Sequence, residues 1–378
     1  MSGSLANQTN VDASVLQAVD RATAELRRGG IVLVRGSGRS AALVQAAEGA
    51  TAANLSAIRD LSRGVPLLLL TVQRAAVLGL VKAAPSAGGV IALDLTGVRA
   101  EAVAELADPT CRRSASLAAG SRLTDAPAGL DTAAVDLAKL ARLLPAALFV
   151  PMPDLADPEG WAAEQDLLSV SASEIAEYRF SAARSLQPVA EAMVPLAGAE
   201  ATRIVAFRPI DGGFEHLAVI IGIPAPDQAV LTRVHSECFT GDLLGSLRCD
   251  CGEQLRGAIS SIAESGAGVL LYLAQEGRGI GLVNKLRAYR LQDQGADTLE
   301  ANQQLGFDAD ERIYLPAAEI LRQLGFRRVR LMTNNPEKVA ALTRCGIAVE
   351  ERVPLSFPSN GHNEFYLATK VRRFGHFT

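Results

Sequence analysis

The sequence predicts an α/β fold with mixed sheets, divided into two domains. The chain has 378 residues, which is more than one hydrophobic core usually organises. In both halves, short β-branched runs alternate with Ala- and Leu-rich stretches of helical character, a pattern typical of α/β domains. A polar stretch at residues 179–187 interrupts this alternation near the middle of the chain. We therefore expect a domain boundary there.

The first half begins with a tail and continues as an alternating region. Residues 1–10 are small and polar, so we expect them to be flexible. Residues 11–178 form the first predicted domain. Its clearest elements are a helix and three strands, expected at residues 15–28, 31–34, 66–72 and 89–93.

The second predicted domain covers residues 188–378, after a linker at residues 179–187. Its strands are expected at residues 203–207, 217–223, 268–273 and 328–332. A glycine-rich loop at residues 275–281 follows the third strand and leads into a long helix through Arg290. Pro336 suits the first position of a further helix, which Gly346 ends. Both strand–loop–helix units present backbone N–H groups at a helix start, which suits phosphate.

Composition narrows the class of protein. Hydrophobic residues make up 49 % of the chain and charged residues 21 %, as in ordinary globular proteins. The net charge of −4 argues against a nucleic-acid or membrane-surface binder. The amino terminus lacks a basic segment followed by an apolar one, and the apolar run at residues 65–72 is too short to span a bilayer. We expect a cytoplasmic protein.

Three of the five cysteines lie between residues 238 and 251, whereas Cys111 and Cys345 stand alone. In a reducing compartment such clustering favours metal over disulfides. Cys238, Cys249 and Cys251 could hold one Zn²⁺ as thiolates and leave the fourth position to water, as a catalytic zinc requires. The alternatives are a closed zinc site that uses one of the four histidines, of which His235 is nearest in sequence, or a set of unrelated buried cysteines.

These cysteines lie in RVHSECFTGDLLGSLRCDCGEQL, residues 233–255, which closely resembles the signature of GTP cyclohydrolase II. The resemblance covers residues 188–378 and includes QEGRGIGLVNKLRAYRLQDQGADTLEANQQLGF, DADER, RLMTNNPEKV and GIAVEERVPL. It implies hydrolytic opening of the imidazole ring of GTP, with release of formate and pyrophosphate, as the first step of riboflavin biosynthesis. It also implies a homodimer that uses Zn²⁺ and Mg²⁺.

The resemblance assigns roles to residues at matching positions. Cys238, Cys249 and Cys251 would be the zinc ligands. Asp310 would accept a proton, and Tyr289 would help to complete ring opening. Arg312 would attack the α-phosphorus as pyrophosphate leaves, although a protonated guanidinium is better suited to stabilising phosphoryl charge. The residues that would bind GTP are Arg233, Val234, His235, Ser236, Glu237, Gln254, Glu276, Gly277, Arg278, Thr298, Thr333 and Lys338.

Several of these residues also have simpler interpretations. Glu276 and Arg278 could form a surface ion pair, and Lys338 could be a solvated helix residue. Tyr289 could be a packed aromatic at helical spacing. Two other functions remain open: a diverged enzyme that acts on another nucleotide or stops at the formamide, and a zinc-stabilised module that binds GTP without turnover.

Residues 20–178 more weakly resemble 3,4-dihydroxy-2-butanone 4-phosphate synthase, in AELRRGGIVLV, AAEGAT, LTGVRAEAVAELADPT and AAVDLAKLARLLPA. That family needs acidic residues after its first strand, but residues 35–44 contain no carboxylate. Leu130 and Thr132 stand where the family has a metal-binding histidine and a glutamate. We therefore predict that the first domain has no synthase activity. Its retained role could be dimerisation, stability or regulation of the second domain, or it could serve only solubility.

Overall fold

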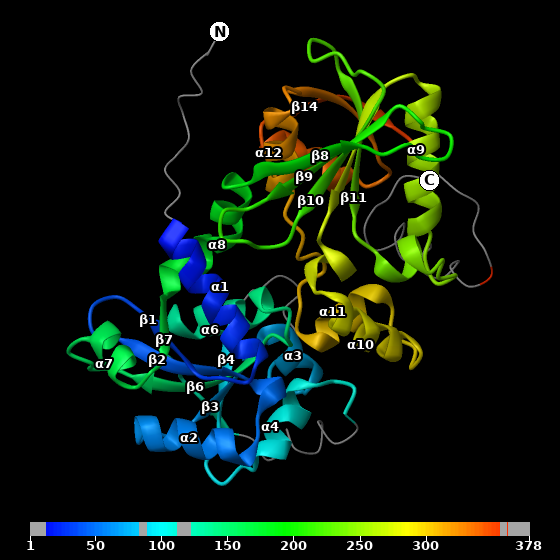
Figure 1. The fold of residues 1–378 in the computed structure, drawn as a ribbon. Helices are drawn as coiled ribbons and strands as arrows, with labels where there is room; N and C mark the ends of the chain where they lie inside the picture. The colour runs from blue at the N-terminus through cyan, green and yellow to red at the C-terminus, as the bar shows by residue number, and fades with distance from the viewer. Residues whose placement is uncertain (1–12, 83–88, 112–121, 356–360, 362–378) are drawn as a thin grey trace. The chain divides into compact units, whose positions relative to one another are not determined.

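The computed structural model describes residues 13–82, 89–111, 122–355 and 361. The predicted tail at residues 1–10 lies outside the described residues, as does most of the chain after residue 355. The chain forms two compact units. Of the described residues, those within Ser14–Tyr178 and Ile280–Glu311 form the first unit, and those within Arg179–Gly279 and from Arg312 onwards form the second. Figure 1 shows the elements of both.

The first unit contains a mixed seven-stranded sheet in the order β5-β4-β3-β6-β2-β1-β7. Strand β1 is parallel to β7 and antiparallel to β2, and the remaining pairs are antiparallel. The strands are β1 Val32–Arg35, β2 Ala41–Ala46, β3 Leu67–Thr71, β4 Val90–Asp94, β5 Arg122–Thr124, β6 Ala146–Met152 and β7 Leu168–Ser171.

Both faces of this sheet are apolar. Neighbouring residues of a strand point to opposite sides, so strands made of consecutive apolar residues contribute to both faces. Val32 and Val34 pack towards one group of helices, and Leu33 towards the other. The first group is α1 Ala13–Arg27, α6 Leu130–Leu140 and the start of α8 Ala172–Arg184. The second group is α2 Ala52–Ser62, α4 Ala100–Ala107, α10 Leu282–Gln292 and α11 Thr298–Leu305. Shorter helical segments are η1 Ala47–Gly49, α3 Val72–Val77 and α7 Pro158–Glu164.

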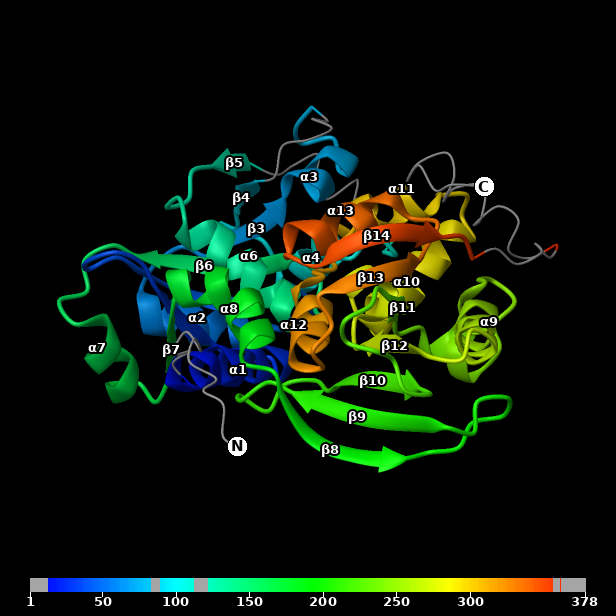
Figure 2. The ribbon, with the colours of Figure 1, turned by 90° about the horizontal axis from the view of Figure 1, so that it is seen from above.

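The second unit is also built on a mixed seven-stranded sheet, in the order β14-β13-β11-β12-β10-β9-β8, which can be followed in Figure 2. The four strands from β14 to β12 are parallel, and β10, β9 and β8 continue antiparallel. The strands are β8 Gln187–Met193, β9 Thr202–Arg208, β10 His216–Ile221, β11 Val230–Ser236, β12 Gly268–Leu273, β13 Arg328–Met332 and β14 Ala348–Val353.

Helices cover both faces of the second sheet. Helix α9 Cys251–Glu264 packs on one face through Ala258 and Ile262. Helices α12 Leu315–Gln323 and α13 Pro336–Arg344 pack on the other. The prediction of an α/β protein with mixed sheets is thus confirmed. Among the described residues, no helix has the combination of length and apolar character needed to cross a membrane.

The predicted elements of both halves are present, with small shifts at their ends. Pro336 begins α13, which ends at Arg344, and Gly346 follows with a φ of 82°. Residues 179–187, expected as a linker, are mostly in regular structure: helix α8 continues to Arg184 and strand β8 begins at Gln187. Their polar side chains suit an exposed helix surface as well as a loop. A domain boundary at these residues stays a prediction.

Candidate metal centre and nucleotide site

Three cysteine side chains converge just beyond the carboxyl end of β11. Cys238 follows that strand, and Cys251 is the first residue of α9. The sulfur atoms of Cys238, Cys249 and Cys251 all lie within 4.8 Å of one another, and those of Cys238 and Cys249 are 3.7 Å apart. Sulfurs about 2.3 Å from one tetrahedral Zn²⁺ lie about 3.8 Å apart. The cluster therefore fits a zinc ion in size and in donor type.

The backbone beside the thiols leaves no room for a side chain at residue 241. Residues Phe239–Leu243 form a single π-helical turn, η2, a rare feature that occurs often at functional sites. A Cβ added to Gly241 would lie 2.7 Å from the Cys249 sulfur and 3.0 Å from that of Cys238. Glycine thus lets this turn pack directly against the thiol cluster.

The proximity of the thiols makes their ionisation unfavourable without a cation. The hydrogen bond with Cys238, together with burial, raises the pKa of the Cys249 thiol to about 11. Hydrogen bonds with Cys238 and Cys249 also raise the pKa of Cys251. A bound divalent cation reverses this balance because it stabilises the thiolates. Without a cation, these cysteines therefore remain protonated thiols.

Asp242, which the sequence analysis did not single out, joins this cluster to its surroundings. Its carboxylate accepts hydrogen bonds from the Cys238 backbone N–H at 2.9 Å and from the Tyr272 hydroxyl at 3.0 Å. Both carboxylate oxygens lie 3.1 Å from His235 Nε2. The Asp242 side chain is only 6 % exposed. In the sequence, this residue resembles any acidic residue in a turn.

His235 is held in a defined orientation by Asp242 and Tyr272. Its ring stacks on that of Tyr272, with the centroids 5.5 Å apart. Burial lowers the pKa of His235 despite the hydrogen bond to Asp242, which favours the neutral imidazole. Because the Asp242 carboxylate can only accept, Nε2 carries the proton and Nδ1 is left as an acceptor.

Buried cations gather near β11 in the second unit. The Arg233 guanidinium donates to the Met332 carbonyl at 2.9 Å and to Gln254. Burial lowers the pKa of Arg233 to about 10, and the positive charge of Arg312 contributes to this lowering. The Lys338 ammonium donates to the Val234 carbonyl at 2.8 Å and is 7 % exposed. Such a concentration of positive charge suits phosphate.

The glycine-rich loop after β12 orients a buried carboxylate. Glu276 is 3 % exposed and accepts hydrogen bonds from the backbone N–H groups of Phe239, at 2.6 Å, and Gly277, at 2.8 Å. Gly277 and Arg278 have φ angles of 61° and 62°. The left-handed conformation of Arg278 costs about 1 kcal/mol. The burial of Glu276 and Lys338 rules out the simpler interpretations as a surface ion pair and a solvated lysine.

Other residues predicted to bind GTP also lie near the carboxyl ends of the parallel strands. The Thr333 hydroxyl follows β13 and accepts from the Asn335 backbone N–H at 3.0 Å. The Glu237 backbone N–H donates to the Leu273 carbonyl at 2.8 Å. The Ser236 hydroxyl and His235 Nδ1 are buried polar atoms without a hydrogen-bond partner within the described part of the chain. Ligands commonly bind at this edge of open α/β sheets.

Three of the predicted site residues belong to the first unit. Tyr289 lies on α10, with its ring centroid 5.7 Å from the Lys285 ammonium nitrogen. Thr298 begins α11 and accepts from Gln292 at 3.3 Å. Asp310 follows α11, two residues before Arg312, where the chain passes into the second unit. Each of these positions is therefore set by the packing of the first unit.

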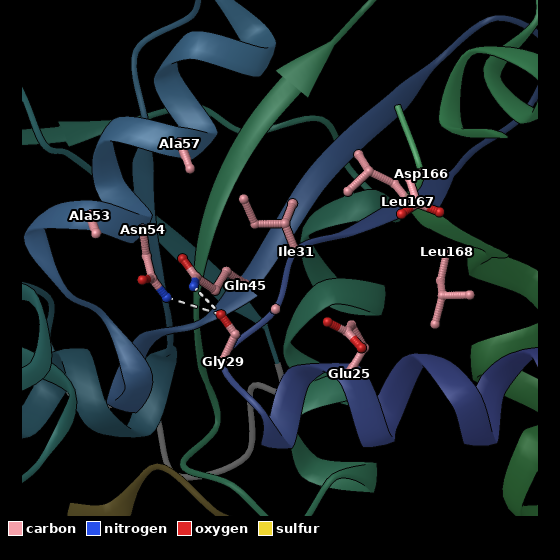
Figure 3. A pocket seen from close by; sticks show the side chains of 11 residues that line it. Glu25, Gly29, Ile31, Gln45, Ala53, Asn54, Ala57, Asp166, Leu167 and Leu168 are labelled. Atoms are coloured by element: carbon pink, nitrogen blue, oxygen red, sulfur yellow. Dashed lines mark hydrogen bonds between the residues drawn. The ribbon is translucent and has the colours of Figure 1, made fainter. Parts of the chain in front are cut away.

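The first unit also contains a pocket of about 520 Å³, shown in Figure 3. It lies between the end of α1, α2 and the start of β7. Gln45 and Asn54 both donate hydrogen bonds to the Gly29 carbonyl, at 2.5 and 2.9 Å. None of the predicted site residues lines this pocket; the lining residues are Glu25, Gly29, Gly30, Ile31, Gln45, Ala53, Asn54, Ala57, Asp166, Leu167 and Leu168.

Similar solved structures include a two-domain 3,4-dihydroxy-2-butanone 4-phosphate synthase from A. baumannii. It is 18 % identical, with a TM-score of 0.33, and the match covers 90 % of this chain and 99 % of that chain. A 3,4-dihydroxy-2-butanone 4-phosphate synthase in complex with two magnesium ions is also 18 % identical, with a TM-score of 0.34. That match covers 43 % of this chain and 98 % of that one. At these scores the likeness is too weak to assign chemistry.

Sequence relatives are far closer. The family model of GTP cyclohydrolase II matches residues 187–354. A GTP cyclohydrolase-2 of Yersinia pestis is 55 % identical over 191 residues, which are 50 % of this chain and 97 % of that protein. A GTP cyclohydrolase-2 of Azospirillum brasilense is 56 % identical over 369 residues, which are 97 % of this chain and 95 % of that protein. With such identity along nearly its whole length, the chain belongs to the GTP cyclohydrolase II family.

Proposed function

We propose that this protein is a GTP cyclohydrolase II, which opens the imidazole ring of GTP by hydrolysis and releases formate and pyrophosphate. The product is a diaminopyrimidine nucleotide, and the reaction is the first step of riboflavin biosynthesis. The observation that carries the proposal is the cluster of Cys238, Cys249 and Cys251, of which the first two are buried, in the unit that also contains the buried cations Arg233 and Lys338. The near full-length identity to a GTP cyclohydrolase-2 supports it.

The three cysteines would hold one Zn²⁺. When bound, zinc lowers the pKa of a coordinated water towards neutrality and so supplies hydroxide for attack on C8 of guanine. Gly241 and Asp242 support this assignment, because one provides space at the sulfurs and the other fixes the Cys238 backbone. Mg²⁺ would bind mainly through phosphate oxygens of the substrate, which needs few protein ligands.

The remaining groups bind and orient GTP. The Glu276 carboxylate, held by two backbone N–H groups, keeps lone pairs for the guanine N1–H and amino group. Arg233 and Lys338 neutralise phosphate oxygens. The other proposed GTP-binding residues are Val234, His235, Ser236, Glu237, Gln254, Gly277, Arg278, Thr298 and Thr333.

Three residues carry the proton and phosphoryl steps in this proposal. Asp310 accepts a proton during hydrolysis. Arg312 stabilises the charge that develops at the α-phosphoryl group as pyrophosphate leaves. Tyr289 helps to complete ring opening after the first hydration.

Product analysis tests the proposed function. Zinc-loaded protein is incubated with GTP and Mg²⁺, and formate, pyrophosphate and the diaminopyrimidine are followed together. We expect all three products. Pyrophosphate without formate would instead indicate a diverged enzyme, and GTP binding without any product would indicate a binding module.

We expect the Asp242→Asn variant to bind zinc about 10- to 100-fold more weakly, with a similar loss of kcat, because groups that orient metal ligands have effects of this size. The substitution preserves shape but weakens the hold on the Cys238 N–H, His235 and Tyr272 together. Zinc affinity is measured by competition with a chelator. Asp227→Asn, at an exposed loop position, is the matched control, and equal zinc affinities in the two variants would contradict the prediction.

We expect no formation of the four-carbon synthase product from ribulose 5-phosphate. Such a reaction needs a base and a metal to stabilise an enediolate, whereas residues 35–44 contain no carboxylate. Leu130, which stands where the synthase family has a metal-binding histidine, is a buried side chain in the apolar core beside α1 and α6. Detection of the product with purified protein and Mg²⁺ would overturn this prediction.

We further propose a cytoplasmic homodimer whose first domain covers residues 11–178 and whose catalytic domain covers residues 188–378. Neither the net charge of −4 nor the described helices favour a nucleic-acid or membrane partner. Light scattering after size-exclusion chromatography tests the dimer. A mass equal to a single chain of 39.6 kDa would contradict it.

A further inference from the structure

Residues 280–311 carry Tyr289, Thr298 and Asp310 but share a hydrophobic core with residues 14–178. The shared core includes strand residues such as Leu33, Leu43 and Leu68. The contributing residues of the later segment are Ile280, Ala288, Leu291, Ala296, Ala301, Leu305 and Phe307, and all of them are buried. The domain that resembles the synthase therefore forms the surface on which this part of the GTP cyclohydrolase segment folds.

The contact is close at the end of α11, where no side chain fits at residue 306. Gly306 has a φ of 90°, and a Cβ there would lie 2.8 Å from the Thr71 hydroxyl oxygen and 2.9 Å from Pro145 Cγ. The buried Arg74 guanidinium donates to the Gln304 carbonyl at 3.4 Å and to the Leu106 carbonyl at 2.9 Å. Glycine at this turn lets its backbone pack directly against the side chains of Thr71 and Pro145.

A group of four polar residues, which we call the Lys139 latch, holds the end of the segment. The latch consists of Lys139 on α6, Gln73 on α3, and Asp308 and Glu311 after α11. The Lys139 ammonium lies 2.8 Å from Glu311 Oε1 and 3.7 Å from Asp308 Oδ2. Gln73 donates to Asp308 at 2.7 Å, and the Asp308 backbone N–H donates to Glu311 at 3.1 Å.

The central ion pair of the latch is shielded from water. The side chains of Lys139 and Glu311 are only 12 % and 7 % exposed. An exposed ion pair contributes little, but removal of one partner from a buried pair leaves an uncompensated charge and has a large effect. Loss of the Lys139 charge should therefore strongly affect the position of the Glu311 side chain.

Glu311 lies between Asp310 and Arg312 in the chain, and consecutive Cα atoms are only about 3.8 Å apart. We propose that the first domain positions catalytic residues for ring opening. In this proposal the ion pair of Lys139 with Glu311 fixes the backbone that carries Asp310 and Arg312. This inference rests on the proposed function. Lys139 is a positioning residue, since it acts on the reaction through Glu311.

Polar contacts with the first domain are also made by α10, the helix that carries Tyr289. The Arg287 side chain lies 3.2 Å from Glu48 and 3.5 Å from Asp108. Asn284, fully buried, donates to the Arg142 carbonyl at 3.1 Å. Glu48 and Lys139 lie in AAEGAT and AAVDLAKLARLLPA, two of the segments that resemble the synthase. Segments that resemble the synthase thus contact the segment, residues 280–311, that resembles GTP cyclohydrolase II.

Full-length Lys139→Met tests the proposal, with Lys82→Met as control because Lys82 is an exposed lysine of the same unit. We expect kcat for formate release to fall about 10- to 100-fold in Lys139→Met, since small misplacements of catalytic groups have effects of this size. The KM for GTP and the zinc content should stay close to those of the wild type. Lys139→Arg should restore most of kcat because it keeps the ion pair.

Hydrogen exchange gives a second, independent measurement. In Lys139→Met, peptides covering residues 300–315 should exchange faster, while peptides covering residues 238–255 should be unchanged. If Lys139→Met does not fold, Gln73→Leu, which removes only the bond to Asp308, should lower kcat in the same way but by less. An unchanged kcat in a folded variant would overturn the positioning role. Absence of turnover by the wild type in the same assay would instead contradict the proposed function.

Discussion

Cys249→Ser is expected to lose formate release by at least about 1,000-fold, equivalent to about 4 kcal/mol of activation free energy. The Cys249 sulfur lies 3.7 Å from that of Cys238 and within 4.8 Å of that of Cys251. Serine is a poor ligand for zinc because its hydroxyl does not ionise near neutral pH, whereas a thiol does so on binding the metal. Zinc content and formate release, measured on the same samples, should fall together.

Cys345→Ser is the matched control for this prediction. Cys345 lies just after α13, is half-buried, and is not part of the cluster. We expect it to keep its zinc and its activity. A Cys249→Ser protein that retained both stoichiometric zinc and formate release would show that the three thiols are not the catalytic metal site.

Arg312→Ala is expected to lower turnover of GTP by about 10³- to 10⁵-fold, the range found when an arginine that stabilises a transferring phosphoryl group is removed. The Arg312 charge acts on Arg233, whose pKa burial has already lowered to about 10. An anion bound beside both guanidinium groups would offset the repulsion between their charges. Pyrophosphate and formate release should be followed separately, because the first reports directly on phosphoryl transfer.

Two further variants sharpen this prediction. Arg312→Lys keeps the positive charge and should recover part of the lost rate if charge stabilisation is the role of this residue. Arg330→Ala removes an exposed partner of Glu351 on β13 and should leave turnover within about threefold of the wild type, since such pairs contribute about 0–1 kcal/mol. Pyrophosphate release by Arg312→Ala at the wild-type rate would contradict the assignment.

Local sequence was sufficient for the features that depend on short-range chemistry. The spacing of Cys238, Cys249 and Cys251 predicted one metal site, because two thiols two residues apart and a third a short loop earlier in the chain can converge on one ion. Strands such as β1 and β4 were predicted from short β-branched runs, and the start of α13 from Pro336. The missing carboxylates of residues 35–44 were also visible in the sequence alone.

Tertiary structure decided which of these residues are buried and what they contact. Asp242 joins Cys238, His235 and Tyr272 only because β11 and β12 are neighbours and η2 folds back over them. The helices of residues 280–311 pack on strands more than a hundred residues earlier in the chain, where Lys139 meets Glu311. No local pattern encodes such contacts, since the pairing of distant strands and the sharing of one apolar core arise only when the whole chain folds.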